Sequence, residues 1–486
     1  MSEKEQVENK NNVVTRFAPS PTGFMHVGGI RTALYAWLWA KKNNGTFILR
    51  IEDTDKEREI AGSIEHIIES LNWLGINWDE GPNIGGPHAS YLQSERLDLY
   101  KKYAQILIDK DLAYPDPYTE EEVGIFRDQA ELAKKPFLYR EHRPEVFDKW
   151  DACPSSGGAT KPLRFKTPKI KSYKWNDLVY GDLSAGPEAL DDFILIKSDG
   201  YPTYNFAHIV DDIEMGVTHV MRGQEFISST PKFLSIYDAL DIKAPLYATL
   251  PPIMGADGKK KLGKRDGAKD VLEYRNEGYL PEAMINFLAL LGWNPGDERD
   301  IFTVDELIEA FDISRIGHSG AQMNLEKLDW INKEHIKKMG FEELKKNIFE
   351  YLPDELKIEK LVPIITERIS KWGDIKNMIE AGELDFFYKI PVYQKEKLIY
   401  KNTTQEKIFE NIKLAIDTLG GLDEKDFTVL NIKNILMEIA NGLESRGELL
   451  HPVRYALSGL DKSPDPFVIA EVLGKNETLS RLQKAI

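Results

Sequence analysis

A histidine followed by two glycines stands at the start of a helix-like stretch near the N-terminus. Residues 18–29 read APSPTGFMHVGG, in which His26 comes shortly before the pair Gly28 and Gly29. Glycines at a helix start let a ligand approach the backbone, and the unpaired N–H groups there favour phosphate. The His26 ring can also donate a hydrogen bond to a phosphate whose charge grows during a displacement reaction. The pattern indicates a nucleotide site, although a loop histidine more often packs against or caps a helix.

A run of five cations in a glycine-containing loop forms the second group. Residues 259–265 read KKKLGKR, with Lys261, Lys264 and Arg265 around Gly263. A departing pyrophosphate needs mobile positive charge, and lysine supplies it as a flexible point charge. Basic runs are usually solvated surface features, but this one contrasts with a chain of net charge −16.

Two further groups could bind the charged ends of an amino acid. Arg50 and Glu52 share one face of a predicted strand, and a strand-end carboxylate beside a nucleotide loop could hold an ammonium group. Pairing between Arg50 and Glu52 is an equally good interpretation. Tyr204 and Arg222 could orient a carboxylate, because arginine can bind it through two parallel hydrogen bonds. The two aspartates at 211–212 are equally typical of turns and helix caps.

The elements that position these groups alternate between strand and helix. Residues 13–18 and 46–52 have strand-like sequences, and residues 30–42 between them are helix-like. Residues 64–74 place apolar side chains three and four apart and end before Gly75, which predicts an amphipathic helix. Such alternation predicts an α/β fold with a parallel sheet, in which ligands bind at the strand ends.

The pattern changes along the chain and predicts six segments. It loosens between positions 112 and 199, where turn-rich stretches mix with charged helical ones, and helical periodicity dominates from residue 336 onward. The segments are a flexible tail (1–12), the first half of the sheet domain (13–111), an inserted domain (112–199), the second half of the sheet domain (200–255), a domain with the lysine-rich loop (256–335) and an all-helical region (336–486).

Composition limits the class of protein. The 486 residues are 42% hydrophobic and 29% charged, which is typical of a globular protein with roughly three or four domains. The net charge of −16 argues against indiscriminate nucleic-acid binding but permits a local basic groove. The single cysteine, Cys153, permits neither an internal disulfide nor a multi-cysteine zinc site. The sequence has no signal-peptide pattern and no long apolar run, so we expect a cytoplasmic protein without a membrane span.

In combination and in this order, the motifs closely resemble those of bacterial-type glutamyl-tRNA synthetases. The stretches that carry the likeness are APSPTG, HVGG, RIEDTD, GYPTY, the aspartate pair and KLGKR, and the resemblance runs from about Val13 to the C-terminus. This family belongs to the class I aminoacyl-tRNA synthetases, whose two signature loops correspond to residues 26–29 and 261–265. The resemblance implies a Rossmann-like catalytic domain with an inserted acceptor-stem-binding domain, then a stem-contact domain, and an anticodon-binding region at 336–486.

The resemblance also implies a two-step reaction. Glutamate attacks the α-phosphate of ATP to give glutamyl-adenylate and pyrophosphate, and the glutamyl group then passes to a terminal ribose hydroxyl of tRNA(Glu). The family further implies ATP with Mg²⁺, a need for tRNA during activation, and a monomeric enzyme. The sequence leaves open whether tRNA(Gln) is charged as well.

Matching positions in the family's motifs imply roles for individual residues. Catalytic roles fall to His26, Lys261, Lys264 and Arg265, and ATP contacts to Pro19, Ser20, His26, Gly28, Gly29 and Lys264. Glutamate contacts fall to Arg16, Ser20, Glu52, Tyr204 and Arg222. Among these, Arg16 would pair with the side-chain carboxylate and Glu52 would hold the α-ammonium. Arg368 aligns with an arginine that reads the anticodon.

Several positions depart from the family's pattern. Gly263 replaces a serine of most members and Asp266 a histidine of many, so ATP affinity or loop dynamics could differ. His208 stands where relatives have asparagine, and its contact with substrate is left open. Residues 114–118 read YPDPY where some members carry zinc-binding cysteines, so we expect no structural zinc and no other metal held by the protein.

Two other functions fit part of the sequence. A nucleotidylyltransferase acting on a small substrate would use a similar phosphate loop, but such enzymes rarely need a long helical C-terminal part. A non-catalytic RNA-binding relative would be expected to lack His26 or Lys264, and both are present.

Overall fold

The computed structural model describes residues 13–147, 149–150, 161–168, 170–263 and 269–486. Contacts divide the chain into two compact units, of which the first runs to Arg275 and also includes Pro281–Ile331. The second comprises Asn276–Leu280 and Asn332–Ile486. The predicted tail at 1–12 lies outside the described residues, and the six segment boundaries remain predictions.

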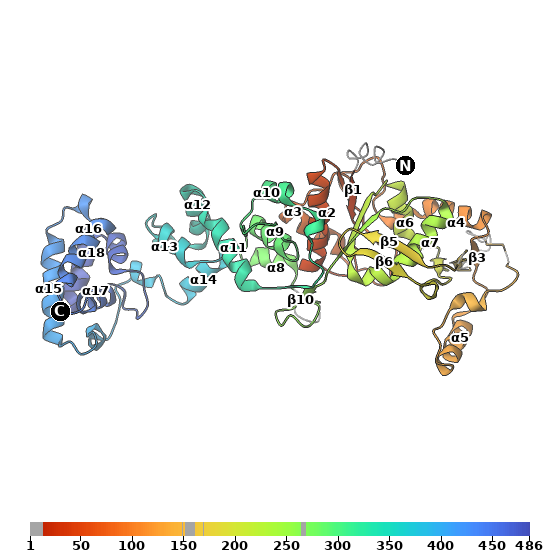
Figure 1. Cartoon of the computed structure of the whole chain (residues 1–486). Coiled ribbons are helices and arrows are strands. Elements are labelled where there is room, and N and C mark those ends of the chain that lie inside the picture. The colour runs from red at the N-terminus through yellow and green to blue at the C-terminus, as the bar shows by residue number, and fades with distance from the viewer. Residues whose placement is uncertain (1–12, 148, 151–160, 169, 264–268) are drawn as a thin grey trace. The chain divides into compact units, whose positions relative to one another are not determined.

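A sheet of six strands, counted over the described residues, forms the core of the first unit (Figure 1). All neighbouring strands pair in parallel except β5 and β6, so β6 is an antiparallel edge strand. In spatial order the strands are β2 (Thr46–Leu49), β1 (Val14–Phe17), β8 (His219–Gly223), β9 (Leu246–Leu250), β5 (Tyr173–Asp177) and β6 (Gly181–Ala185). The predicted α/β fold with a parallel sheet is confirmed.

The first strand, helix and strand form the predicted β-α-β unit. Helix α2 (Val27–Lys42) packs against β1, and its buried face includes Ile30 and Leu34. Strand β2 ends at Leu49, earlier than the predicted stretch at 46–52, but the backbone N–H of Glu52 still donates to the Pro19 carbonyl at 3.0 Å. This bond holds the end of the second strand beside the loop that follows the first.

Further helices belong to the same unit as the sheet. The helix predicted at 64–74 is confirmed to within one residue at each end as α3. The helices are α3 (Ser63–Trp73), α4 (Leu97–Asp109), α6 (Tyr204–Glu214), α7 (Thr230–Leu240), α8 (Val271–Asn276), α9 (Pro281–Leu290) and α10 (Val304–Ala310). A short parallel pair, β10 (Ile253–Met254) with β11 (Ala321–Gln322), lies next to the lysine-rich segment.

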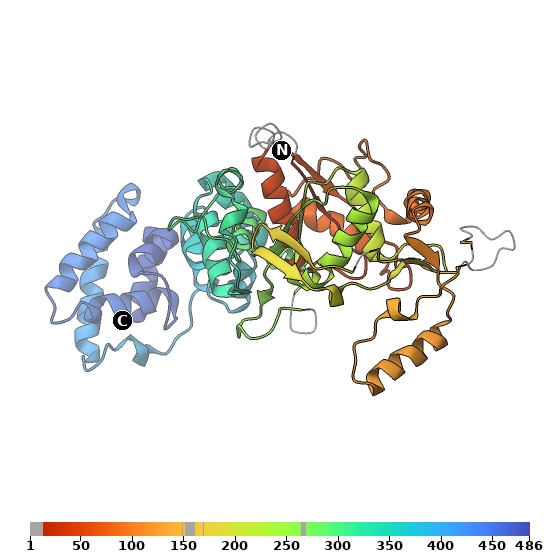
Figure 2. The same ribbon diagram turned by 45° about the vertical axis from the view of Figure 1, so that its right-hand side comes forward.

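Residues in the range 112–199 contribute to two sheets. Strands β3 (Ala113–Pro115), β4 (Leu163–Phe165) and β7 (Ile194–Ile196) form an antiparallel sheet of their own. Helix α5 (Glu120–Leu132, orange in Figure 2) extends away from the main sheet. Strands β5 and β6 come from the same range but join the main sheet beside β9. No local pattern in the sequence predicted this pairing.

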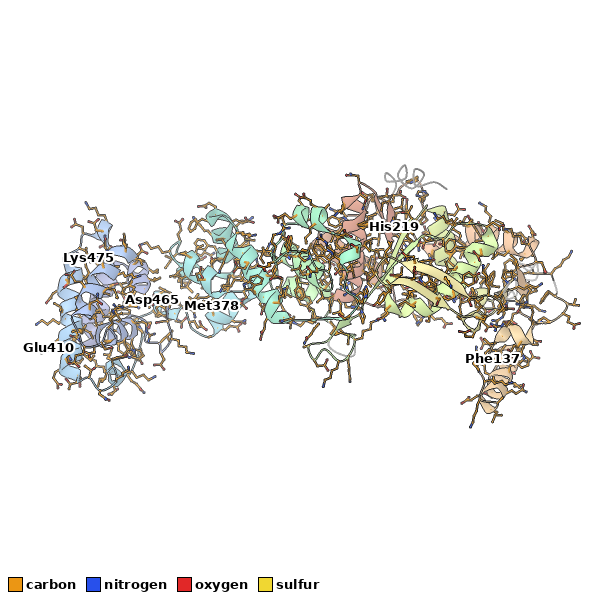
Figure 3. The ribbon with its side chains drawn as sticks, viewed as in Figure 1. Phe137, His219, Met378, Glu410, Asp465 and Lys475 are labelled. Carbon is orange, nitrogen blue, oxygen red and sulfur yellow. The ribbon has the colours of Figure 1, made fainter. Side chains whose placement is uncertain are left out.

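The stretch YPDPY at residues 114–118 contributes Asp116 to a buried polar cluster. Asp116 accepts hydrogen bonds from Arg164 Nε at 2.9 Å and from the Tyr139 hydroxyl. The Arg164 guanidinium lies 3.4 Å from the centre of the Tyr139 ring. Phe137, which is labelled in Figure 3, meets the Tyr139 ring edge-on. Side-chain pairing therefore holds this part of the chain to strand β4.

The second unit is helical throughout the residues that the structure describes, as predicted for 336–486. Helix α11 (Leu325–Lys337) begins in the first unit, which ends at Ile331, and continues into the second. The helices that follow are α12 (Phe341–Tyr351), α13 (Leu361–Arg368), α14 (Gly373–Glu380), α15 (Gln405–Gly420), α16 (Val429–Asn441), α17 (Gly447–Ser458) and α18 (Pro466–Ala485). Across the described residues, every helix is too short or too polar to cross a lipid bilayer.

Candidate active site

A cavity of about 390 Å³ lies at the carboxyl ends of β1, β8 and β9. Ligands bind at this edge of open parallel sheets. The predicted site residues that line it are Arg16, Ser20, His26, Gly28, Gly29, Glu52, Tyr204, Arg222 and Lys261. Pro19 belongs to the same loop as Ser20 but is not part of the lining. Lys264, Arg265 and Asp266 lie outside the described residues.

His26 caps the N-terminus of α2 and lines the cavity. The backbone N–H of Gly28 donates to His26 Nδ1 at 3.0 Å. Because Nδ1 accepts this bond, the neutral ring carries its proton on Nε2, where it can donate to an anion. A Cβ atom at Gly28 would lie 2.8 Å from His26 Cε1, so the close packing requires glycine. The capping role and a phosphate role are therefore compatible.

Lys261 brings the second basic group to the same cavity. The backbone N–H of Leu262 donates to the Ile253 carbonyl at 2.7 Å, which fixes the start of the loop on β10. Lys261 Nζ lies 3.2 Å from Glu225 Oε2, and both side chains are exposed. The two groups predicted to converge, around His26 and around Lys261, thus share one cavity.

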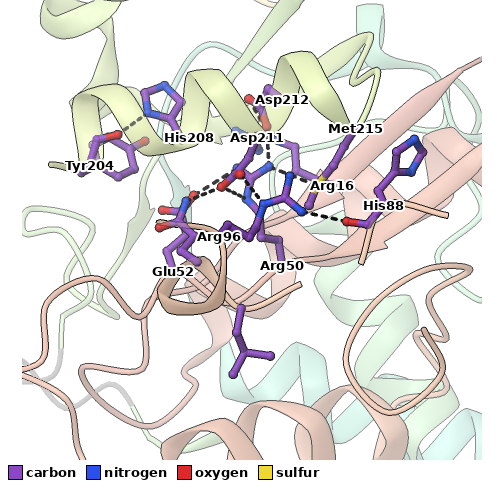
Figure 4. Close-up of polar contacts among 12 residues, drawn as sticks. Arg16, Arg50, Glu52, His88, Arg96, Tyr204, His208, Asp211, Asp212 and Met215 are labelled. Carbon is purple, nitrogen blue, oxygen red and sulfur yellow. Dashed lines mark hydrogen bonds and ion pairs between the residues drawn. The ribbon is translucent and has the colours of Figure 1, made fainter. Parts of the chain in front are cut away.

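Three arginines and three carboxylates form a buried network beside the cavity (Figure 4). Its members are Arg16, Arg50, Arg96, Glu52, Asp211 and Asp212. Arg16 Nε lies 3.1 Å from Asp212 Oδ1. Arg50 donates to Asp212 Oδ1 at 2.8 Å and to Glu52 Oε1 at 3.1 Å. The Arg50–Glu52 contact agrees with one of the two interpretations of that strand end. Both aspartates serve as partners of buried arginines.

The network sets the protonation of its carboxylates. Burial alone would raise the pKa of Asp212, but Arg16 and Arg50 lower it to about 2. Burial raises the pKa of Glu52 to about 7, against the opposing effect of Arg50. At neutral pH Asp212 is therefore ionised, whereas Glu52 is close to its midpoint. A cation that binds beside Glu52 would favour its ionised form.

Arg222 is a buried cation in the wall of the cavity. Its Nη2 donates to the Thr230 hydroxyl at 2.6 Å, but within the described part of the chain its Nε and Nη1 have no hydrogen-bond partner. Its guanidinium lies 4.4 Å from the centre of the Tyr247 ring, and burial lowers its pKa. Unpaired buried donors are rare because they lose their bonds to water. This arrangement suits an anionic ligand.

Tyr204 and His208 form one stacked pair. Tyr204 lines the cavity, and the His208 ring stacks on it with 4.5 Å between ring centres. His208 Nδ1 lies 2.6 Å from the Tyr204 carbonyl oxygen, and burial lowers the pKa of His208 to about 3. His208 is not part of the lining. It therefore supports Tyr204 as a neutral ring.

Comparison with known proteins gives the family of the chain. Residues 12–330 match the family described as the catalytic domain of class I tRNA synthetases (E and Q), and residues 330–486 match an anticodon binding domain. The chain belongs to this class I tRNA synthetase family. The resemblance found from the motifs is thereby confirmed.

Relatives match over almost the whole chain. A glutamate–tRNA ligase of Clostridium botulinum (strain Hall) is 42% identical over 480 residues, which are 98% of this chain and 98% of the relative. One of Clostridium kluyveri is 41% identical over 493 residues, covering 98% of this chain and 97% of the relative. The crystal structure of a glutamate tRNA ligase from Elizabethkingia meningosepticum, in complex with its amino acid, matches 97% of this chain and 99% of that chain. Its TM-score is 0.84 and its sequence identity is 37%.

Arg31 is a lining residue of this family member that the sequence analysis missed. It lies on α2, where Nη1 donates to the Leu291 carbonyl at 3.0 Å and Nη2 to the Pro251 carbonyl. Burial lowers its pKa. The available signal was a single basic residue inside the apolar helical stretch IRTALYAWLW. A buried arginine bonded to two backbone carbonyls fastens α2 to distant segments.

Among the residues that the structure describes, no three His, Cys, Asp or Glu side chains gather in the way that a metal site requires. Two carboxylates line the cavity among these residues: Glu52, which Arg50 engages, and Glu225, which pairs with Lys261.

Proposed function

We propose that the chain is a glutamate–tRNA ligase. It activates L-glutamate with ATP and then transfers the glutamyl group to the 3′ end of tRNA(Glu). One observation carries the proposal: the loop around His26, which suits phosphate, and the buried, partly unpaired Arg222 line the same cavity. The family supports it, because the curated relatives described above are glutamate–tRNA ligases.

The acidic amino acid would bind between the cations and Glu52. Arg222 has donors without partners, and Arg16 lines the cavity while its Nε and Nη1 bond Asp212 and the Met221 carbonyl, so both would hold the side-chain carboxylate. Glu52 would accept the α-ammonium, and Tyr204 would orient the ligand. With glutamine in place of glutamate, these cations would stay buried without a counter-charge, which costs several kcal/mol.

ATP would lie along the loop that starts α2. His26 Nε2 and the backbone at Gly28 and Gly29 would contact its phosphates, with Pro19 and Ser20 beside them and Lys261 reaching in from the second loop. Lys264 and Arg265 keep the phosphate roles that the family's motif implies. A glutamate carboxylate oxygen attacks the α-phosphorus while the bond to the leaving pyrophosphate breaks. The surrounding cations stabilise the charge that develops. Mg²⁺, which binds largely through substrate phosphates, would accompany the ATP.

The second unit would bind the anticodon. Arg368 lines a cavity of about 590 Å³ there, together with Lys360, Lys462 and the apolar Ile364. Apolar walls with cations at the rim suit a stacked nucleic-acid base. Arg368 is also paired with Glu383, so the arginine is held in a defined orientation. We further infer a monomer that works in the cytoplasm.

The anticodon proposal is tested with Arg368→Ala. Loss of this contact is expected to raise KM for tRNA about tenfold and leave KM for glutamate unchanged. Lys389→Ala is the control, because Lys389 is an exposed cation of the same unit paired with Asp385. An Arg368→Ala variant with unaltered KM for tRNA would contradict this assignment.

The function itself is tested by ATP–pyrophosphate exchange with the full chain. We expect exchange with glutamate when tRNA(Glu) is present and little with glutamine or with tRNA omitted. A nucleotidylyltransferase would instead exchange pyrophosphate only when its own small substrate is supplied, and it would need neither glutamate nor tRNA. Charging assays with tRNA(Glu) and tRNA(Gln) transcripts then show whether one or both tRNAs are substrates. Absence of glutamate-dependent exchange would refute the proposed function.

A further inference from the structure

A histidine outside the cavity joins the two signature regions. His66 lies on α3, and its side chain is 11% exposed. Its Nδ1 accepts the backbone N–H of Met25 at 3.3 Å, and its Nε2 lies 2.7 Å from Asp270 Oδ2. Because Nδ1 accepts a hydrogen bond, the ring proton lies on Nε2, which donates a hydrogen bond to the Asp270 carboxylate. One imidazole thus contacts the residue before His26 and a residue shortly after the lysine-rich loop.

Asp270 fastens the chain after the lysine-rich loop in two further ways. Its Oδ1 accepts the backbone N–H of Leu272 at 2.9 Å, which caps the start of α8. Its backbone forms an antiparallel bridge with His26, and the N–H of Val271 donates to the Met25 carbonyl at 3.0 Å. The exit from the lysine-rich loop is therefore tied directly to the backbone around His26.

The entrance to the same loop is tied to α2 from the other side. Arg31 donates to the carbonyl of Pro251, which stands just before β10. Strand β10 in turn pairs with the chain at Lys261 through the bridge from Met254. Both ends of the segment from Pro251 to Asp270 are thus held by residues close to His26. His66 provides the side-chain link at the exit.

We propose that His66 is a positioning residue for adenylate formation, a role that rests on the proposed function. Its bonds to Met25 and Asp270 keep the His26 ring and the lysine-bearing segment at the separation in which both act on one triphosphate. His66 does not line the cavity, so it acts through these neighbours. Loss of alignment by about 1 Å can lower a reaction rate on the order of 100-fold.

Variants can test the hydrogen bonds from His66 to Met25 and to Asp270. His66→Ala removes both, whereas His66→Gln keeps a donor near the position of Nε2. Asp270→Asn keeps an oxygen to cap Leu272 but replaces the acceptor that faces His66. The matched control is His88→Ala, because His88 Nδ1 lies 2.7 Å from Glu80 Oε2 in a similar pair that takes no part in the cavity.

The kinetic readout is tRNA-dependent ATP–pyrophosphate exchange by the full chain, with the melting temperature as the check on folding. We expect His66→Ala and Asp270→Asn to lower kcat by about 10- to 100-fold and to raise KM for ATP. KM for glutamate is expected to stay within about twofold, because the amino-acid pocket is built on other elements. His66→Gln should recover most of the activity, and His88→Ala should match the unaltered chain.

Two kinetic results would overturn the proposal. One is His66→Ala with unaltered kcat and KM for ATP. The other is an equal rise in KM for ATP and in KM for glutamate, as a general structural defect would give. Hydrogen exchange at residues 24–30 provides a readout that needs no activity, and it separates this proposal from the function. If the unaltered chain shows no exchange of pyrophosphate, the proposed function fails, whereas equal amide exchange in His66→Ala and His88→Ala would refute the role of His66.

Discussion

Two charged side chains lie where burial makes them unfavourable until a ligand arrives. Arg222 has buried donors without partners among the described residues, and burial holds the pKa of Glu52 near 7. A zwitterionic acid would satisfy both, since its side-chain carboxylate suits the guanidinium and its ammonium suits the carboxylate. The protein alone is less stable for carrying them, as functional sites commonly are. At the residue scale the proposed amino-acid pocket is therefore built from opposite, separated charges.

Replacing Arg222 is expected to harm function and improve stability at once. Arg222→Met should raise KM for glutamate by at least about 100-fold, because a charge-assisted carboxylate contact is lost. The free energy of unfolding should rise by about 1–3 kcal/mol, since unpaired buried donors are removed. Steady-state exchange kinetics and denaturant unfolding measure the two effects. The control is Arg58→Met, because that side chain is 76% exposed. A lower free energy of unfolding for Arg222→Met than for the unaltered chain would contradict the inference that buried donors of Arg222 are unpaired.

Glu52 predicts how activity depends on pH. Its pKa of about 7 means that it loses its charge as the pH falls below 7, and a neutral carboxyl binds an ammonium group poorly. The value of kcat/KM for glutamate should therefore fall about tenfold per pH unit in the acidic range and level off above about pH 8. Glu52→Gln should be weakly active and should lack this inflection. Protonation of ATP would affect both proteins equally, so loss of the inflection in the variant assigns it to Glu52. An unchanged inflection in that variant would assign it to another group.

The start of α2 shows how an element positions the His26 ring, which is proposed to contact ATP. The helix begins where the Gly28 N–H meets His26 Nδ1, and the absence of a side chain at Gly28 leaves room for the ring. Sheet and helix packing fix the helix axis through buried residues such as Leu34. The orientation of His26 is thus a property of the whole β1–α2 connection.

A pair of glycine substitutions tests this positioning. Gly28→Ala places a Cβ atom within 3.0 Å of His26 Nδ1, so the ring must move, and kcat should fall by about 10- to 100-fold. Gly124 lies inside α5, where an added Cβ atom would meet no neighbouring atom within 4 Å. Gly124→Ala should therefore leave kcat unchanged and stabilise the chain by about 0.5–1 kcal/mol. Exchange kinetics and thermal unfolding report both effects. Equal kcat for the two variants would argue against a ring fixed by Gly28.

Elements were predictable where one local pattern determined them. Hydrophobic spacing and turn residues predicted β1, α2 and α3, because each buries its own apolar face. The attachment of β5 to β9 was not predictable, since pairing partners in a sheet are chosen by contacts far apart in sequence. The same holds for Asp212 on α6, whose role depends on Arg16 of β1 and on Arg50, which follows β2. Arg222 was predicted from its motif, but its unpaired state required the structure.

At the scale of the whole molecule, the chemistry and the proposed tRNA reading lie in different compact units. The cavity around His26 belongs to the first unit, and the cavity around Arg368 belongs to the second. The family matches follow the same division, with catalytic and anticodon-binding parts meeting at residue 330. The motifs predicted both parts, because signature loops and helical periodicity are readable locally. The cavities themselves depend on tertiary packing.

The claim on which the account depends is that buried cations in the first unit select an anionic amino acid. It is tested most directly by the ratio of kcat/KM for glutamate to that for glutamine when the full chain charges a tRNA(Glu) transcript. The account predicts a preference for glutamate of at least about 1,000-fold, which corresponds to roughly 4 kcal/mol. Charging of both amino acids at comparable rates would contradict it.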